Sequence, residues 1–135
     1  MDYIGIDAYF TVDTNKTSSL DSSLFNWLAI KNEIKSFSEE NSKQIIFTEY
    51  GYRSADYSGF KPYAAHSDQV NLAAQANLYR SLYYTFWDES WFLGGFSWVW
   101  YFNNNQPEGY DNIDYTPQNK PAENILAKNY GRFKN

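Results

Sequence analysis

The sequence predicts an α/β fold with three consecutive βα units and a parallel sheet. Strand-like and helix-like segments alternate along the 135 residues, in the order strand–helix–strand–helix–strand–helix. Strand–helix–strand connections of this kind are right-handed and place the strands in parallel. The length suits a single domain, and we expect the three units to cover 1–40, 41–90 and 91–135.

The first strand is expected over Tyr3–Phe10, where apolar and polar residues alternate. The apolar face consists of Ile4, Ile6 and Ala8, and the other face of Tyr3, Gly5, Asp7 and Tyr9. A face that holds Asp7 and Tyr9 is not a plain core face. It is either functional or the wetted side of an edge strand.

The first helix is expected from about Asp21 to Ser38, with Asp21 or Ser22 as its N-cap. Apolar residues recur there at steps of three and four, which is the period of a helix with one buried side. They are Leu24, Trp27, Leu28, Ile30, Ile34 and Phe37. We interpret this stripe as packing surface and not as a ligand site.

The second strand opens the stretch Gln44–Ser54. Positions 45–47 are β-branched or aromatic and uncharged, which is typical of a buried strand. The strand ends in Glu49, and an aromatic, a glycine and then Arg53 follow within four residues. Parallel α/β folds place catalytic carboxylates at this end of a buried strand. The alternative is a polar turn in which Glu49 is a solvated charge.

The second helix is expected from Ser67 or Asp68 to about Trp87, and His66 just before it is interpreted as a loop residue. Its expected buried side is Val70, Ala73, Ala74, Leu78, Leu82 and Phe86.

The third strand is expected over Phe92–Phe102, with Phe96, Trp98 and Trp100 on one side. A long loop follows over Asn103–Lys120; loops of this length are more often functional or disordered than filler. Pro121 suits the first position of a last helix. The apolar stripe of that helix is Ala122, Ile125, Leu126, Tyr130 and Phe133.

The composition narrows the function. Aromatic residues make up 21% of the chain, which suits an aromatic core or a cleft that stacks on sugar rings. The net charge of −5 and the lack of a basic run argue against nucleic-acid binding. With no cysteine and His66 as the only histidine, we expect neither a metal nor a cofactor. We expect no membrane span and see no signal peptide, and the sequence leaves cytoplasmic and secreted locations open.

Three right-handed units place all three helices on one face of the sheet, although a parallel sheet expects cover on both faces. The uncovered face would carry Tyr9, Glu49, Trp98 and Trp100. The two outer strands would also be unpaired edges. We therefore expect the chain to belong to a larger closed structure, or to associate to complete one.

Four segments resemble a known family: Asp2–Tyr9, Phe47–Ser54, Gly95–Trp100 and Asn119–Glu123. Together they resemble glycoside hydrolase family 113, in the clan of retaining glycosidases built on (β/α)8 barrels, whose known activity is mainly endo-β-1,4-mannanase. The resemblance implies that the three strands are the sixth, seventh and eighth of the barrel. The expected fold is then a (βα)3 partial TIM barrel from the C-terminal portion.

The resemblance also implies site residues. Glu49 matches the catalytic nucleophile, Tyr9 the tyrosine whose hydroxyl supports it, and Trp98 the aromatic floor of the −1 sugar subsite. Asp7, Arg53 and Trp100 are further substrate-binding candidates. The expected ligand is a β-linked, mannan-type oligosaccharide or polysaccharide.

The resemblance implies that the acid/base carboxyl lies on the fourth strand of the barrel, and no segment of this chain matches strands one to five. The loop carboxylates Asp56, Glu108 and Asp111 receive no such assignment. We therefore expect little or no glycosidase activity from the isolated chain. The expected partner is the missing N-terminal half-barrel or a second copy, although two copies would supply six strands and not eight.

Two other hypotheses stay open. The chain is a non-catalytic carbohydrate-binding module that uses Trp98 and Trp100, or the aromatic face is an association surface without sugar affinity. Sugar binding without hydrolysis would favour the first. A stable oligomer that binds no sugar would favour the second.

Overall fold

The computed structural model describes residues 2–103 and 109–132. Three parallel strands form one sheet in the order β1 (Tyr3–Asp7), β2 (Gln44–Tyr50) and β3 (Phe92–Ser97). The helices that follow them are α1 (Leu20–Asn41), α2 (Leu72–Phe86) and α3 (Pro121–Gly131), and a short 3-10 helix covers Gly109–Asp111. The predicted α/β fold of three βα units is confirmed.

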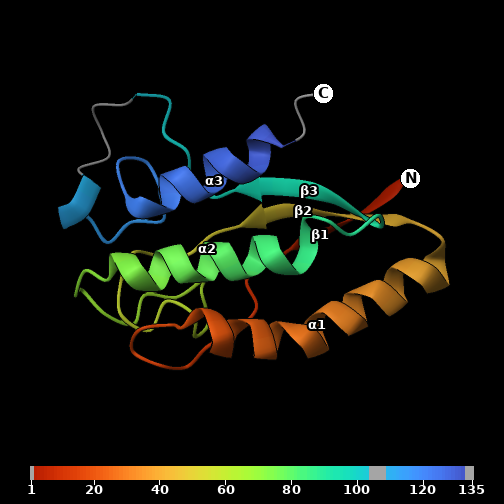
Figure 1. Cartoon of the computed structure of the whole chain (residues 1–135), viewed down its shortest axis with the longest axis horizontal. Helices are drawn as coiled ribbons and strands as arrows, with labels where there is room; N and C mark the ends of the chain where they lie inside the picture. The colour runs from red at the N-terminus through yellow and green to blue at the C-terminus, as the bar shows by residue number, and fades with distance from the viewer. Residues whose placement is uncertain (1, 104–108, 133–135) are drawn as a thin grey trace.

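The three helices cover one face of the sheet, and α2 lies between α1 and α3 (Figure 1). Along β1, Ile4 and Ile6 pack against the core, whereas Tyr3, Gly5 and Asp7 are exposed. The predicted alternation is therefore confirmed over these five residues, but the strand ends at Asp7 and not at Phe10. The opposite face of the sheet carries no helix from the described residues.

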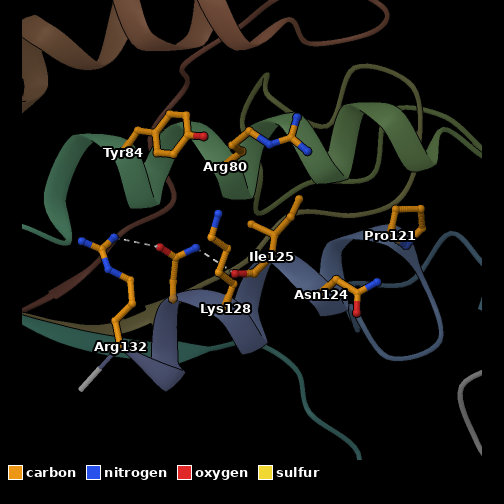
Figure 2. A pocket seen from close by; sticks show the side chains of 8 residues that line it. Arg80, Tyr84, Pro121, Asn124, Ile125, Lys128 and Arg132 are labelled. Atoms are coloured by element: carbon orange, nitrogen blue, oxygen red, sulfur yellow. Dashed lines mark hydrogen bonds between the residues drawn. The ribbon is translucent and has the colours of Figure 1, made fainter. Parts of the chain in front are cut away.

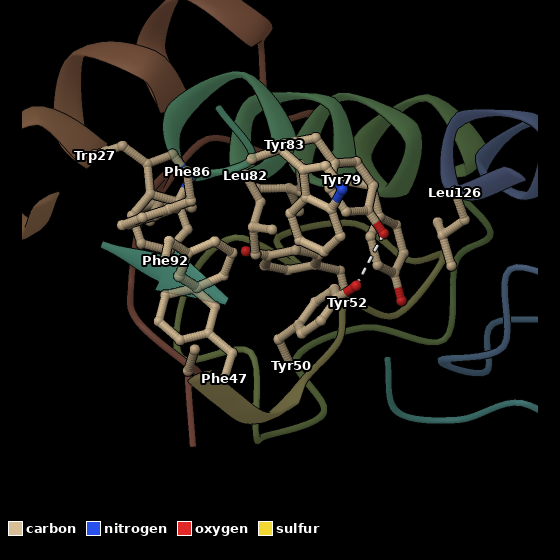
Figure 3. Close-up of a cluster of buried hydrophobic side chains, with 14 of the residues drawn as sticks. Trp27, Phe47, Tyr50, Tyr52, Tyr79, Leu82, Tyr83, Phe86, Phe92 and Leu126 are labelled. Atoms are coloured by element: carbon tan, nitrogen blue, oxygen red, sulfur yellow. Dashed lines mark hydrogen bonds between the residues drawn. The ribbon is translucent and has the colours of Figure 1, made fainter. Parts of the chain in front are cut away.

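An aromatic cluster fills the space between the sheet and α2. The ring of Phe47 lies 5.0 Å from Phe86 and 4.8 Å from Phe92, and Trp27 lies 5.1 Å from Phe86, centroid to centroid. Figure 3 shows these rings gathered beneath α2. The buried indole of Trp27 donates to the hydroxyl of Ser81 at 3.1 Å, so its polar atom is satisfied. Part of the aromatic surplus is thus core, whereas rings such as Phe96, Trp98 and Trp100 are exposed.

The helix starts differ from the prediction, because different side chains cap them. Ser19 caps α1 and accepts from the backbone N–H of Ser22 at 3.1 Å. Asn71 caps α2 and accepts from Ala74 at 3.0 Å. The segment predicted to open α2 instead turns at Ser67 and forms a bridge between Ala55 and Val70. Pro121 opens α3 as predicted.

Two predicted apolar stripes are partly wrong. In α1, Leu28 and Phe37 are 56% and 48% exposed, because α1 has a helical neighbour on one side only. Val70 lies before α2, and both it and Ala73 are exposed. The third strand is also shorter than predicted and ends at Ser97. Phe133, assigned to the last stripe, lies outside the described residues.

Each edge of the sheet carries an apolar hollow between the edge strand and its helix. The hollow beside β1 is lined by Ile6, Phe10, Ile30, Glu33, Ile34 and Phe37. The hollow beside β3 is lined by Gly95, Phe96, Ser97, Trp100, Glu123, Leu126, Ala127 and Tyr130. These are the places where the next βα unit of a barrel would pack, so the chain has the surface of an open, partial barrel.

Candidate active site

A β-bulge turns Glu49 toward the uncovered face of the sheet. Ile6 pairs with Phe47 and Asp7 with Glu49, so two residues of β2 advance against one residue of β1. Without this extra residue, Glu49 would follow the alternation of Ile45 and Phe47 and point into the core. The bulge instead places Thr48 and Glu49 on the same side as Asp7, and the Thr48 hydroxyl donates to Asp7 at 2.7 Å.

Glu49 accepts a short hydrogen bond from the phenol of Tyr9 through Oε1. The backbone N–H of Ala8 also donates to the carbonyl of Glu49 at 2.7 Å, which continues the β1–β2 pairing past β1. Burial raises the pKa of Tyr9 well above its usual range, and the hydrogen bond and negative charge of Glu49 raise it further. The phenol therefore stays protonated and serves Glu49 as a donor.

Tyr115 joins this pair from the long loop before α3. Its ring meets the Tyr9 ring edge-on, at 6.4 Å between centroids and 80° between planes. The guanidinium carbon of Arg53 lies 4.7 Å from the centre of the same ring. Arg53 forms no ion pair with any carboxylate of the described chain, and its buried Nε has no hydrogen-bond partner there. Arg53 is thus linked to Glu49 through two rings, not by direct charge pairing.

Trp98 continues the pairing beside the end of β2. Its backbone N–H donates to the carbonyl of Tyr50 at 2.7 Å, and its side chain is 48% exposed. A Cβ on Gly51 would lie 2.2 Å from the Trp98 carbonyl oxygen, so only glycine permits this approach. Trp100 lines the hollow beside α3, which none of Glu49, Tyr9 and Arg53 lines.

The structure therefore brings together five of the six predicted site residues at the carboxyl ends of the strands: Asp7, Tyr9, Glu49, Arg53 and Trp98. Trp100 instead lines the hollow between β3 and α3. Sequence reasoning missed Tyr115, and the length of the Asn103–Lys120 loop was the only signal that pointed to its segment.

Other candidate residues lie elsewhere. His66 is exposed, and its Nε2 lies 3.3 Å from the Lys61 carbonyl oxygen. Asp56 pairs with Lys16 at 3.6 Å and accepts from Asn71 at 2.7 Å, which ties together two loops. Glu108 lies outside the described residues.

A hollow between α2 and α3 contains three cationic side chains and no carboxylate (Figure 2). Arg132 is held by Asp88 and Asn129, and Arg80 donates to Asn77 at 3.3 Å. None of the six predicted site residues lines this hollow. It is therefore a feature of helix packing, separate from the Glu49 cluster.

Within residues 2–103 and 109–132, no three or more His, Asp and Glu side chains gather in a way that could hold a metal ion. In the same part of the chain, no helix combines the length and the apolar character needed to cross a membrane.

The family model of glycoside hydrolase family 113 matches residues 1–120. The chain belongs to glycoside hydrolase family 113. A search of curated proteins found no significant match.

Solved structures agree with this family. The GH113 β-mannanase AaManA from Alicyclobacillus acidocaldarius, solved in complex with ManMIm, is 25% identical with a TM-score of 0.77. The match covers 97% of this chain and 39% of the mannanase. A second GH113 β-1,4-mannanase is 22% identical with a TM-score of 0.74 and the same coverage, and shows the fold.

A β-glucuronidase from Faecalibacterium prausnitzii also shares the fold, at 20% identity and a TM-score of 0.61, over 98% of this chain and 22% of that chain. This family 113 chain thus spans about two fifths of the length of the mannanases that it matches. The predicted partial barrel is confirmed as the fold class.

Proposed function

We propose that the chain carries the nucleophile side of a retaining glycoside hydrolase site for β-linked, mannan-type polysaccharide. The observation that carries this proposal is the hydrogen bond from Tyr9 to Glu49 on the uncovered face, at the carboxyl end of a strand in a family 113 chain. Glu49 is half-buried and Asp7 is exposed, so this part of the sheet is open to a ligand.

In the proposed reaction, a carboxylate oxygen of Glu49 attacks the anomeric carbon. The bond from that carbon to the glycosidic oxygen breaks, and an acid protonates the leaving oxygen. Water then attacks the same carbon, loses its proton to the conjugate base of that acid, and releases Glu49. Tyr9 holds the Glu49 carboxylate in place during both steps by donating its hydroxyl hydrogen bond.

The remaining predicted residues contact the sugar in this proposal. The half-exposed indole of Trp98 stacks on the apolar face of a pyranose ring. Asp7 and Arg53 offer polar groups to sugar hydroxyls. Trp100 lies in the β3–α3 hollow and serves a more distant part of the ligand or the contact with a neighbouring βα unit.

We assign the acid/base carboxyl to βα units outside this chain. Retention requires it roughly 5–5.5 Å from the nucleophile. The uncovered face and the two apolar hollows support a neighbouring βα unit at each edge of the sheet, beside β1 and beside β3. Asp7 is the carboxylate that the strand register brings beside Glu49, and it accepts a hydrogen bond from Thr48. We assign Asp7 to substrate binding and not to the acid role.

Covalent trapping tests the nucleophile without an acid catalyst. A 2-fluoro-mannoside with a dinitrophenolate leaving group reacts by forming the Glu49–C1 ester while the C1–phenolate bond breaks, and the fluorine slows hydrolysis of the ester. We expect an adduct on the peptide that contains Glu49, read by intact mass and peptide mapping. Glu49→Gln should abolish the adduct, and Glu39→Gln, an exposed carboxylate of α1, should not.

Assays of the completed barrel, in which the chain is joined to the missing βα units, distinguish the glycosidase from the non-catalytic binding module. Glu49→Gln should abolish turnover of mannan there, whereas substantial remaining turnover would contradict the assignment. Manno-oligosaccharide binding that depends on Trp98 but is indifferent to Glu49→Gln, with no hydrolysis by the completed barrel, would instead favour the non-catalytic binding module.

A further inference from the structure

Tyr115 is held more tightly than an ordinary loop residue. It is 8% exposed, its hydroxyl donates to the carbonyl of Pro62 at 2.5 Å, and its backbone N–H donates to the carboxylate of Asp114 at 2.7 Å. A Cβ on Gly51 would lie 3.3 Å from the edge of its ring. The ring therefore has one position, set by the loop after β2.

The backbone around Tyr115 is tied to β2 and α2. The buried amide of Gln75 donates to the carbonyls of Tyr115 at 3.1 Å and Tyr52 at 3.0 Å. The backbone N–H of Ser54 donates to the carbonyl of Asp114 at 3.3 Å. The loop before α3 and the loop after β2 thus behave as one anchored unit, since buried hydrogen bonds of this kind are costly to break.

The fixed ring of Tyr115 has two neighbours that matter for the site. Its edge contact with Tyr9 limits where the Tyr9 phenol can lie, and Arg53 covers its face at 4.7 Å. Edge-on ring contacts and cation–ring contacts of this kind stabilise the positions of both partners. The Tyr9 phenol then donates to Glu49, so the order of contacts is Arg53, Tyr115, Tyr9, Glu49.

We propose that Tyr115 is a positioning residue that fixes the Tyr9 hydroxyl on Glu49, with Arg53 holding the Tyr115 ring in place. The catalytic consequence rests on the proposed function, because Glu49 must be the nucleophile for its position to affect turnover. The contact between Tyr115 and Tyr9 does not depend on the proposed function. Through Tyr115, the conformation of the loop before α3 sets the geometry of a carboxylate on β2.

The phenol of Tyr9 reports this geometry in the 135-residue chain without any turnover. With tyrosine labelled at the ring carbon that bears oxygen, we expect the Tyr9 NMR signal to titrate well above the range of an ordinary phenol, because burial and Glu49 raise its pKa. Besides Glu49, Tyr115 and Tyr79 are the titratable groups that act on this phenol. Tyr9→Phe assigns the signal, and Glu49→Gln shows how much of the effect comes from the carboxylate.

Tyr115→Leu removes the ring and should lower the pH at which the Tyr9 signal titrates, because the phenol loses the contact that holds it on Glu49. It should also abolish the difference that Glu49→Gln makes, because a freed phenol no longer bonds Glu49. Tyr115→Phe keeps the ring and should leave Tyr9 close to the wild type. Tyr110→Leu, an exposed tyrosine close by in the chain, is the matched control and should change nothing.

Arg53→Gln should act in the same direction as Tyr115→Leu, by a smaller amount, and it carries the test if Tyr115→Leu does not fold. An unchanged Tyr9 titration in folded Tyr115→Leu, or in Arg53→Gln, would overturn the proposal. Its failure is distinct from failure of the proposed function. An adduct on Glu49 with a Tyr9 titration indifferent to Tyr115 would refute only the positioning role. A Tyr9 titration that depends on Tyr115, with turnover by the completed barrel that survives Glu49→Gln, would refute only the nucleophile.

Discussion

The two faces of one three-stranded sheet differ in almost every respect. On the helix-covered face, Ile45, Phe47 and Tyr50 are fully buried and their neighbours are mostly aromatic rings. On the uncovered face, Thr48 and Glu49 of the same strand bond to Asp7 and Tyr9. The first face gives the chain its core, and the second holds groups able to do chemistry.

This division shows how a short chain keeps a polar site without weakening its core. Burying a carboxylate in the aromatic cluster would cost several kcal/mol unless it were paired. The bulge in β2 avoids this cost, because it moves Glu49 to the other face while Phe47 and Tyr50 stay buried. Stability and the candidate chemistry thus depend on different side chains of the same strand.

Truncation on either face gives the sharpest contrast. Phe47→Ala should lower the free energy of unfolding by about 3–5 kcal/mol, because it leaves a cavity among packed rings. Thr48→Ala, one residue along on the other face, removes one exposed hydrogen bond and should cost about 1 kcal/mol or less. Urea denaturation of the two variants measures both values. Equal losses would contradict the division between the faces.

Alkaline pH should lower the free energy of unfolding through buried tyrosines such as Tyr52 and Tyr79. Burial raises the pKa of Tyr52 and Tyr79 well above the value near 10 of an exposed phenol. Above about pH 10 the unfolded chain loses phenolic protons that the folded chain keeps, so stability is present below that pH and falls as the pH rises. The loss is about 1.4 kcal/mol per pH unit for each such tyrosine.

Urea midpoints between pH 9 and 11.5 test this fall, and Tyr79→Phe should reduce the slope by about one proton. The same scan between pH 6 and 8, where no phenol titrates, serves as the control. A slope above pH 10 that Tyr79→Phe leaves intact would refute the explanation.

Two neighbouring tyrosines should respond to the same change with opposite signs. The Tyr50 hydroxyl bonds to those of Tyr83 at 3.0 Å and Tyr130 at 2.6 Å, so Tyr50→Phe should lower stability by about 1 kcal/mol. The buried hydroxyl of Tyr52 has no partner among the described residues, so Tyr52→Phe should raise stability by up to about 1 kcal/mol. Thermal unfolding of both variants checks the signs, and a loss in both would show that Tyr52 has a partner.

Much of the fold could be predicted from local patterns. The alternation in Tyr3–Phe10 correctly placed Asp7 opposite the core, and Pro121 marked a helix start, because both follow from backbone geometry alone. The caps Ser19 and Asn71 were missed. Several nearby polar residues compete for each cap position, and contacts such as the bond from Asn71 to Asp56 decide among them.

The sequence by itself determined the three βα units, the parallel sheet and the carboxylate at the end of its central strand. Periodicity and residue type act over a few neighbours, so they can be recognised without a structure. Only the tertiary structure decided that a bulge turns Glu49 away from the core and that Tyr115 reaches Tyr9 from more than a hundred residues away. A bulge depends on how two strands pair, and a loop contact depends on how distant parts of the chain come together. Neither is therefore encoded in a local pattern.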